Sequence, residues 1–163
     1  MEIKRKQLID RLEAVGKEFA QYLADMSEEE ANASPAPDQW SARHLAIHMR
    51  DTEQQVFLLR TEHALYDEHS TVGMFVQEEW EREHPSDRES LQKIIADFRA
   101  ARRKLIRLLR KASKREWDNW VAHPKLGKLS VGVMATFNYS HSLDHLAQLI
   151  DLYEKTLLKR SNQ

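Results

Sequence analysis

The stretch VGVMATFNYSHSLDHLAQLIDLYEKTLLK, residues 131–159, decides the fold because it has the pattern of one long, largely buried helix. Its apolar side chains recur every three or four residues, which is the spacing of neighbours on one helix face. Ser130 stands immediately before it and is a suitable N-cap. We therefore predict a helix that begins after Ser130 and ends at about Lys159, packed against other helices.

Three further segments have the periodicity of amphipathic helices. They span about residues 3–25, 41–66 and 86–112. Ser41 is a good N-cap for the second segment, and Ser86 with Glu89 has the spacing of a capping box for the third. Four long amphipathic helices favour an antiparallel four-helix bundle, so we predict an all-α fold.

The second of these segments carries a histidine on its apolar stripe. The stripe consists of Leu45, His48, Met49, Thr52, Val56 and Leu59. Trp40 stands just before the N-cap of this helix, and we expect its burial to fix the register of the helix. In that register His48 faces the helix at 131–159.

Two connections between the helices are long. ANASPAPDQW, residues 31–40, contains two prolines and separates the first two helices. STVGMFVQEEWEREHP, residues 70–85, can hold a short helix or a lid. Trp80, Trp117 and Trp120 lie in connections, where they either cover the ends of the bundle or line the mouth of a pocket.

Composition favours one domain, residues 1–163, and narrows the functional classes. The 25 Lys and Arg residues nearly balance 26 Asp and Glu residues, so the net charge of −1 attracts neither nucleic acid nor an anionic membrane. The chain has no cysteine, and therefore no disulfide and no protein thiol. No signal peptide or membrane-spanning stretch is evident, so we expect a cytoplasmic protein.

A basic stripe follows the third helix. It consists of Arg99, Arg103, Arg107, Arg110 and Lys114. The stripe lies opposite the apolar face of that helix and has no interleaved aromatic residues on which bases could stack. We interpret it as a solvated surface and expect no nucleic-acid partner.

His141 and His145 are the strongest functional signal in the chain. An i,i+4 pair projects both rings from one helix face about 6 Å apart, close enough to chelate one ion. Taken alone, the pair also fits buried histidines that donate to carbonyl groups. His48 favours the metal, because three neutral imidazoles facing one core would otherwise need three sets of hydrogen-bond partners. We therefore predict a metal site formed by His48, His141 and His145.

Other polar residues near these histidines are ambiguous. Gln148 and Asn138 share the face of the histidine pair, and each either orients a ligand or meets a carbonyl group. His44 falls in the first turn of its helix, where it fits a helix-start role better than metal binding. His123 precedes a proline in a loop and is either structural or a rim residue.

The motifs WSARHLAIHM, residues 40–49, and HPKLGKLSVGVMATFNYSHSLDHLAQL, residues 123–149, resemble the DinB-like superfamily, which includes YfiT-type metal-dependent hydrolases. The similarity spans essentially the whole chain. It implies an up-down-down-up four-helix bundle in which His48, His141 and His145 occupy the family's metal-ligand positions. It also implies zinc or nickel as the ion and a homodimer formed through bundle faces.

Three neutral ligands leave a divalent ion its full charge and at least one open position, which is typical of catalytic rather than structural sites. Water there can act as hydroxide, or a thiol can bind as thiolate, and either can attack a small electrophilic substrate. The superfamily that the chain resembles includes transferases that use bacillithiol, mycothiol or glutathione, as well as hydrolases. A thiol would have to be exogenous. Asp51, Glu53 and Asp144 are candidates for proton transfer only by nearness in sequence.

Three functional classes stay open from the sequence. The first is a metal-dependent hydrolase or thiol transferase. The second is a non-catalytic metal-binding or stress-response module with a degenerate site. The third is a helical interaction protein that uses the basic stripe. Metal content separates the first two classes from the third.

Overall fold

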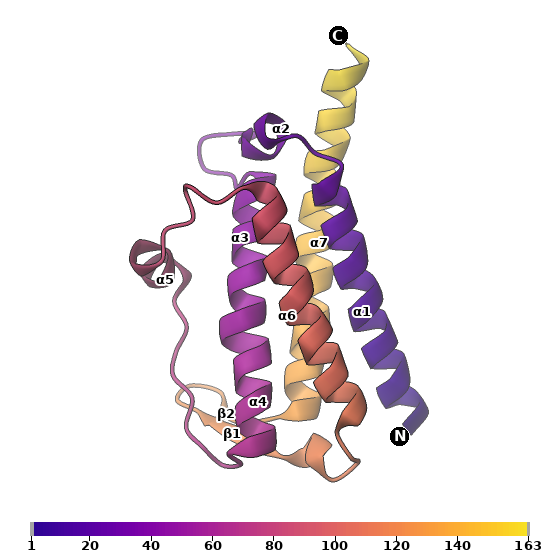
Figure 1. Ribbon diagram of the computed structural model, residues 1–163, viewed down its shortest axis with the longest axis vertical. Coiled ribbons are helices and arrows are strands. Elements are labelled where there is room, and N and C mark those ends of the chain that lie inside the picture. The colour runs from indigo at the N-terminus through magenta and orange to yellow at the C-terminus, as the bar shows by residue number, and fades with distance from the viewer. Residues whose placement is uncertain (1, 163) are drawn as a thin grey trace.

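The computed structural model describes residues 2–162, and its long helices form a four-helix bundle (Figure 1). These are α1 (Glu2–Ala24), α3 (Ala42–Thr52) continued by η1 (Glu53–Leu58) and α4 (Leu59–Tyr66), α6 (Leu91–Lys111) and α7 (Val131–Ser161). In Figure 1, α1 and α7 rise, while α6 and the run from α3 to α4 descend. The up-down-down-up order is therefore confirmed.

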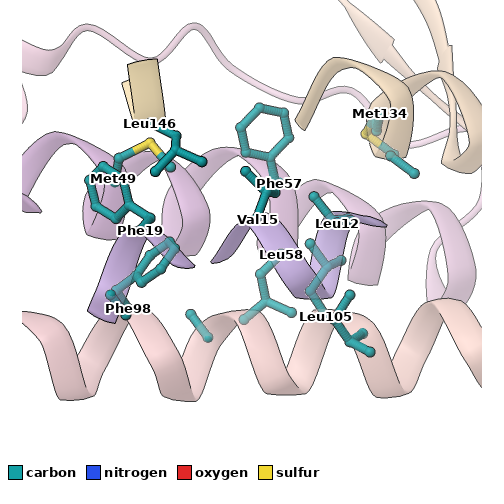
Figure 2. Packing of buried hydrophobic residues seen from close by; sticks show 14 of the residues in the cluster. Leu12, Val15, Phe19, Met49, Phe57, Leu58, Phe98, Leu105, Met134 and Leu146 are labelled. Atoms are coloured by element: carbon teal, nitrogen blue, oxygen red, sulfur yellow. The ribbon is translucent and has the colours of Figure 1, made fainter. Parts of the chain in front are cut away.

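The core lies where the apolar stripes of these helices meet (Figure 2). Phe19 of α1 and Phe98 of α6 pack edge to face, with ring centroids 5.6 Å apart. Met49 of α3 and Leu146 of α7 are also buried in this cluster. Burial of these side chains supplies most of the favourable free energy of folding.

The second long helix contains a π-helical turn that the sequence pattern did not indicate. From Glu53 to Leu58 the turn is wider than an α-helical turn, which shifts the inward-facing positions along the chain. Phe57 and Leu58 are consequently buried, whereas Leu59 is 41% exposed. The prediction that Leu59 belongs to the apolar stripe was wrong for this reason.

The predicted caps at Ser41 and Ser130 are confirmed, because their hydroxyls accept from the backbone N–H of His44 and Val133. The capping box of Ser86 and Glu89 was wrong. Ser90 caps α6 by accepting from the backbone N–H of Lys93. Ser86 and Glu89 instead accept hydrogen bonds from the buried Arg50.

Short elements occupy the connections. Two are helices, α2 (Glu28–Asn32) and α5 (Gln77–Glu83), and a 3-10 turn, η2 (Glu116–Asp118), follows α6. An antiparallel hairpin, β1 (Trp120–His123) with β2 (Gly127–Ser130), leads into α7. The connection at residues 70–85 thus holds a short helix, which was one of the two alternatives that the sequence left open. None of the described helices is long and apolar enough to cross a membrane.

Candidate metal centre

Three histidines from two helices converge inside the bundle. His48 lies on α3, and His141 and His145 lie one turn apart on α7. One ring nitrogen from each lies within 4.8 Å of the others, and Nε2 of His48 is 3.0 Å from Nε2 of His141. All three rings are partly buried. The fold therefore brings together the three side chains that the sequence singled out.

In two of these rings, a hydrogen bond determines which nitrogen carries the proton and which keeps a lone pair. Nδ1 of His48 lies 3.2 Å from Oε1 of Gln77, and Nδ1 of His145 lies 2.9 Å from Oε1 of Gln148. An amide oxygen only accepts, so each Nδ1 carries the proton. Nε2 of each ring is then left with a lone pair, as a metal ligand requires.

His141 differs because its Nδ1 is buried without a hydrogen-bond partner. Its Nε2 faces Nε2 of His48, which has no proton to donate, so Nε2 of His141 donates in the absence of an ion. A cation bound among the three nitrogens would take the lone pair of this Nε2, and the proton of His141 would then be on Nδ1. The donor set and its second layer of amide oxygens therefore fit a divalent metal ion.

Burial keeps the paired rings neutral. Burial, together with nearby His145, lowers the pKa of His48 to about 4. Burial, together with nearby His145 and His48, lowers the pKa of His141 to about 3. Both rings are therefore neutral at neutral pH, so each keeps one nitrogen lone pair that a cation can accept.

We expect the metal-free protein to lose stability as the pH falls below about 6.5. The unfolded histidines then bind protons, whereas His48 and His141 in the folded protein do so only near pH 4 and 3. The contribution of these two rings to stability is fully present above about pH 6.5 and declines as the pH falls toward 4 and 3. Urea unfolding with chelator from about pH 7.5 to about pH 5 measures this. The double variant His48→Gln/His141→Gln should show a weaker pH dependence, and an equal dependence would contradict the expectation.

A buried ionic layer adjoins the histidines. Arg102 of α6 donates from Nε and Nη2 to the two carboxylate oxygens of Glu53, at 2.6 and 2.9 Å. Nη2 also reaches Asn138 and Ser142, which flank His141 on α7. Asn138 thus joins the helices by polar bonds and is not placed to orient a ligand.

Helix α1 passes close to the guanidinium group of Arg102. Nη1 of Arg102 donates to the carbonyl oxygen of Leu12 at 2.8 Å. Gly16 lies one turn later, and a Cβ at this position would come within 2.8 Å of Nη1. A larger residue at Gly16 would therefore displace the guanidinium group from the layer.

Trp40 lies against the histidine cluster instead of anchoring the core. It is 44% exposed, and the prediction that it is buried was wrong. Its ring lies 5.0 Å from the ring of His48 and stacks on that of His145 at 6.2 Å, between centroids. Residue 40 precedes the helix cap, so the chain is still crossing the end of the bundle. An adjoining groove of about 400 Å³, lined by Trp40, His145 and Gln148, reaches one of the three histidines.

The remaining sequence candidates lie elsewhere or in supporting positions. His44 is exposed and stacks on Trp40, outside the three-histidine cluster. Nδ1 of His123 accepts two backbone N–H bonds in the β1–β2 turn, which is a structural role. Asp51 is buried and paired with Arg50, and Asp144 is exposed.

Sequence reasoning missed Gln77, Arg50 and Arg102. Gln77 belongs to the connection that could hold a short helix or a lid, but nothing in the pattern indicated that it reaches His48. Arg50 and Arg102 lie on helices near apolar positions, and a charged residue there could have signalled a buried ion pair.

Comparison with known proteins gives the family. The model of the DinB superfamily matches residues 11–149, so the chain belongs to this superfamily. YfiT from Bacillus subtilis has the same fold, with a TM-score of 0.83 and 16% identity over 96% of this chain and 89% of that one. A DinB-like protein from B. subtilis, YjoA, matches with a TM-score of 0.65 and 12% identity over 92% of each chain. Among curated proteins, none matches the sequence.

Proposed function

We propose that this protein is a metal-dependent enzyme in which His48, His141 and His145 bind one divalent cation, zinc or nickel. One observation carries the proposal: three imidazoles offer nitrogens within 4.8 Å of one another, and two of them are oriented by amide oxygens. The reaction that we infer is attack by water or a low-molecular-weight thiol on a small electrophilic substrate.

The ion would supply Lewis acidity that lowers the pKa of water or of a thiol, and three neutral ligands leave its charge undiminished. The chain supplies the rest of the site. Trp40 shields one side of the histidines from solvent, and the groove beside His145 admits a small molecule. Because the sequence has no cysteine, a thiol nucleophile would be a separate molecule.

The structural likeness to YfiT agrees with this proposal. YfiT is described as "a probable metal-dependent hydrolase with an unusual four-helix bundle topology". At 16% identity the likeness shows the fold, and the proposal for this chain rests on its own three histidines.

A non-catalytic metal-binding module is the second candidate, and one observation favours it. The two carboxylates nearest to His48 in sequence are already engaged, Asp51 with Arg50 and Glu53 with Arg102. Neither is therefore free to move a proton at the site. The exposed Asp144, water or the substrate itself would have to do so in a hydrolase.

Activity measurements separate the two candidates. Metal-loaded protein is incubated with a panel of esters, amides and alkylating or epoxide electrophiles, with water alone or with bacillithiol or glutathione. We expect His145→Ala to lower the rate on any accepted substrate by about 100-fold or more, because outer-layer changes alone cost 10- to 100-fold. His44→Ala is the matched control, since it removes a neighbouring exposed imidazole outside the cluster.

The same rates in wild type and His145→Ala across the panel, with metal bound to the wild type, would contradict the enzymatic proposal. The metal-binding module would then be the better account of the site.

A further inference from the structure

The short helix α5 reaches the metal centre through its first residue. None of the side chains of α5 is buried, and Figure 1 shows this helix standing away from the bundle. Gln77 nevertheless extends inward from α5 to Nδ1 of His48, at 3.2 Å. A residue outside the bundle thus contacts one of the three histidines directly.

The orientation of the Gln77 amide is fixed on its other side. Its nitrogen donates to Oδ2 of Asp51 at 3.1 Å and to Oε1 of Glu81 at 2.8 Å. Carboxylates accept, so the amide NH2 group must face these two residues and the amide oxygen must face His48. His48 can therefore form this hydrogen bond only when its proton is on Nδ1.

Asp51, one of these two carboxylates, is itself held in place. Asp51 is 1% exposed and accepts from Nε of Arg50 at 2.8 Å. The same guanidinium group donates to Glu89 and Ser86, which lie just before α6. The Gln77 amide therefore sits at the end of a chain of charged hydrogen bonds that resists reorientation.

We propose that Gln77 is a positioning residue that holds the proton of His48 on Nδ1, so that Nε2 presents its lone pair to the other two histidines. The effect on metal binding rests on the function proposed above, whereas the position of the proton does not. Gln148 makes the corresponding contact with His145, but it is exposed, so water can replace its oxygen at little cost.

The test replaces Gln77 with methionine, which has a similar length and shape but accepts hydrogen bonds weakly. Gln92→Met on the exposed face of α6 is the matched control, and Gln148→Met tests the exposed counterpart. Long-range proton–nitrogen NMR of the metal-free protein at about pH 8, where imidazoles are neutral, reports which nitrogen of His48 is protonated. Zinc affinity is measured on the same variants by competition with a chelating dye.

We expect the wild type and Gln92→Met to carry the proton on Nδ1 of His48, and Gln77→Met to carry it wholly or partly on Nε2. Zinc affinity should fall about 10- to 100-fold in Gln77→Met, which is the range for outer-layer partners, and less in Gln148→Met. Circular dichroism should be unchanged.

A wild-type proton on Nε2, or an Nδ1 proton retained in Gln77→Met, would overturn the proposal. So would equal zinc affinities in Gln77→Met and Gln92→Met. If the proton moves as expected but the wild type binds no zinc, the positioning role stands and the metal-dependent function fails.

Discussion

Replacing His141 with alanine is expected to weaken zinc or nickel affinity by more than about 100-fold while the bundle stays helical. His141 contributes one of the three converging nitrogens and lies 3.0 Å from His48, so its loss leaves two ligands on opposite helices. The helices persist because their free energy comes from the apolar core, which the substitution leaves in place. Isothermal titration with each metal gives the affinity, and circular dichroism gives the helix content.

His44→Ala is the control for this experiment, because it removes an imidazole near the site without removing a ligand. It should bind metal as the wild type does. If His141→Ala lost its helical signal at room temperature without metal, the ion would have a structural role. Unchanged affinity in His141→Ala would contradict the three-histidine centre.

Removing Glu53 is expected to destabilise the protein by about 3–5 kcal/mol, the cost of stranding a buried charge. In Glu53→Ala, the guanidinium group of Arg102 keeps its neutral partners Asn138 and Ser142 but loses its carboxylate. Arg102 is 4% exposed, so water cannot readily take the place of that carboxylate. Urea unfolding at neutral pH measures the loss.

The double variant Glu53→Leu/Arg102→Met distinguishes a stranded charge from a general packing defect. It removes both charges while keeping side chains of similar size, and replacing a buried ion pair in this way is often neutral or stabilising. We expect it to recover most of the stability lost in Glu53→Ala. A single variant that costs less than about 1 kcal/mol would mean that the ion pair is solvated in solution.

The helices and the clustering of the three histidines could be predicted because both depend on local spacing. Apolar positions recur at helix periodicity in α7, and Ser130 supplies its cap through a hydroxyl that contacts Val133. His141 and His145 necessarily share a face, and His48 lies on the inward stripe of a neighbouring helix. The spacing of residues within each helix was therefore sufficient to predict that the three rings lie together.

The parts that could not be predicted depend on contacts distant in sequence. Ser86 and Glu89 have capping-box spacing, but Arg50, more than 30 positions earlier, binds both of them. Helix-capping rules consider only neighbouring residues and do not include this competition. The N-cap was therefore predicted at Ser86, four residues before its position in the structure. The π-helical turn at Glu53–Leu58 likewise accompanies an ion pair to Arg102 on another helix.

The surroundings of the site were the least predictable from the sequence. Trp40 is a large aromatic residue of the kind that packs in protein cores, yet it stacks on the rings of His44 and His145 at the end of the bundle. Gln77 is one polar residue in a polar connection, and only its distance to His48 distinguishes it. Periodicity carries no information about such contacts, because they join loops to helices.

We propose above all that His48, His141 and His145 hold one ion together. X-ray absorption at the zinc edge tests it most directly, on protein prepared without a histidine tag and loaded with one equivalent of zinc. We expect a first shell at about 2.0–2.1 Å with the multiple-scattering pattern of three imidazoles, completed by a light atom from solvent. A shell of oxygen atoms with one imidazole or none would contradict the claim.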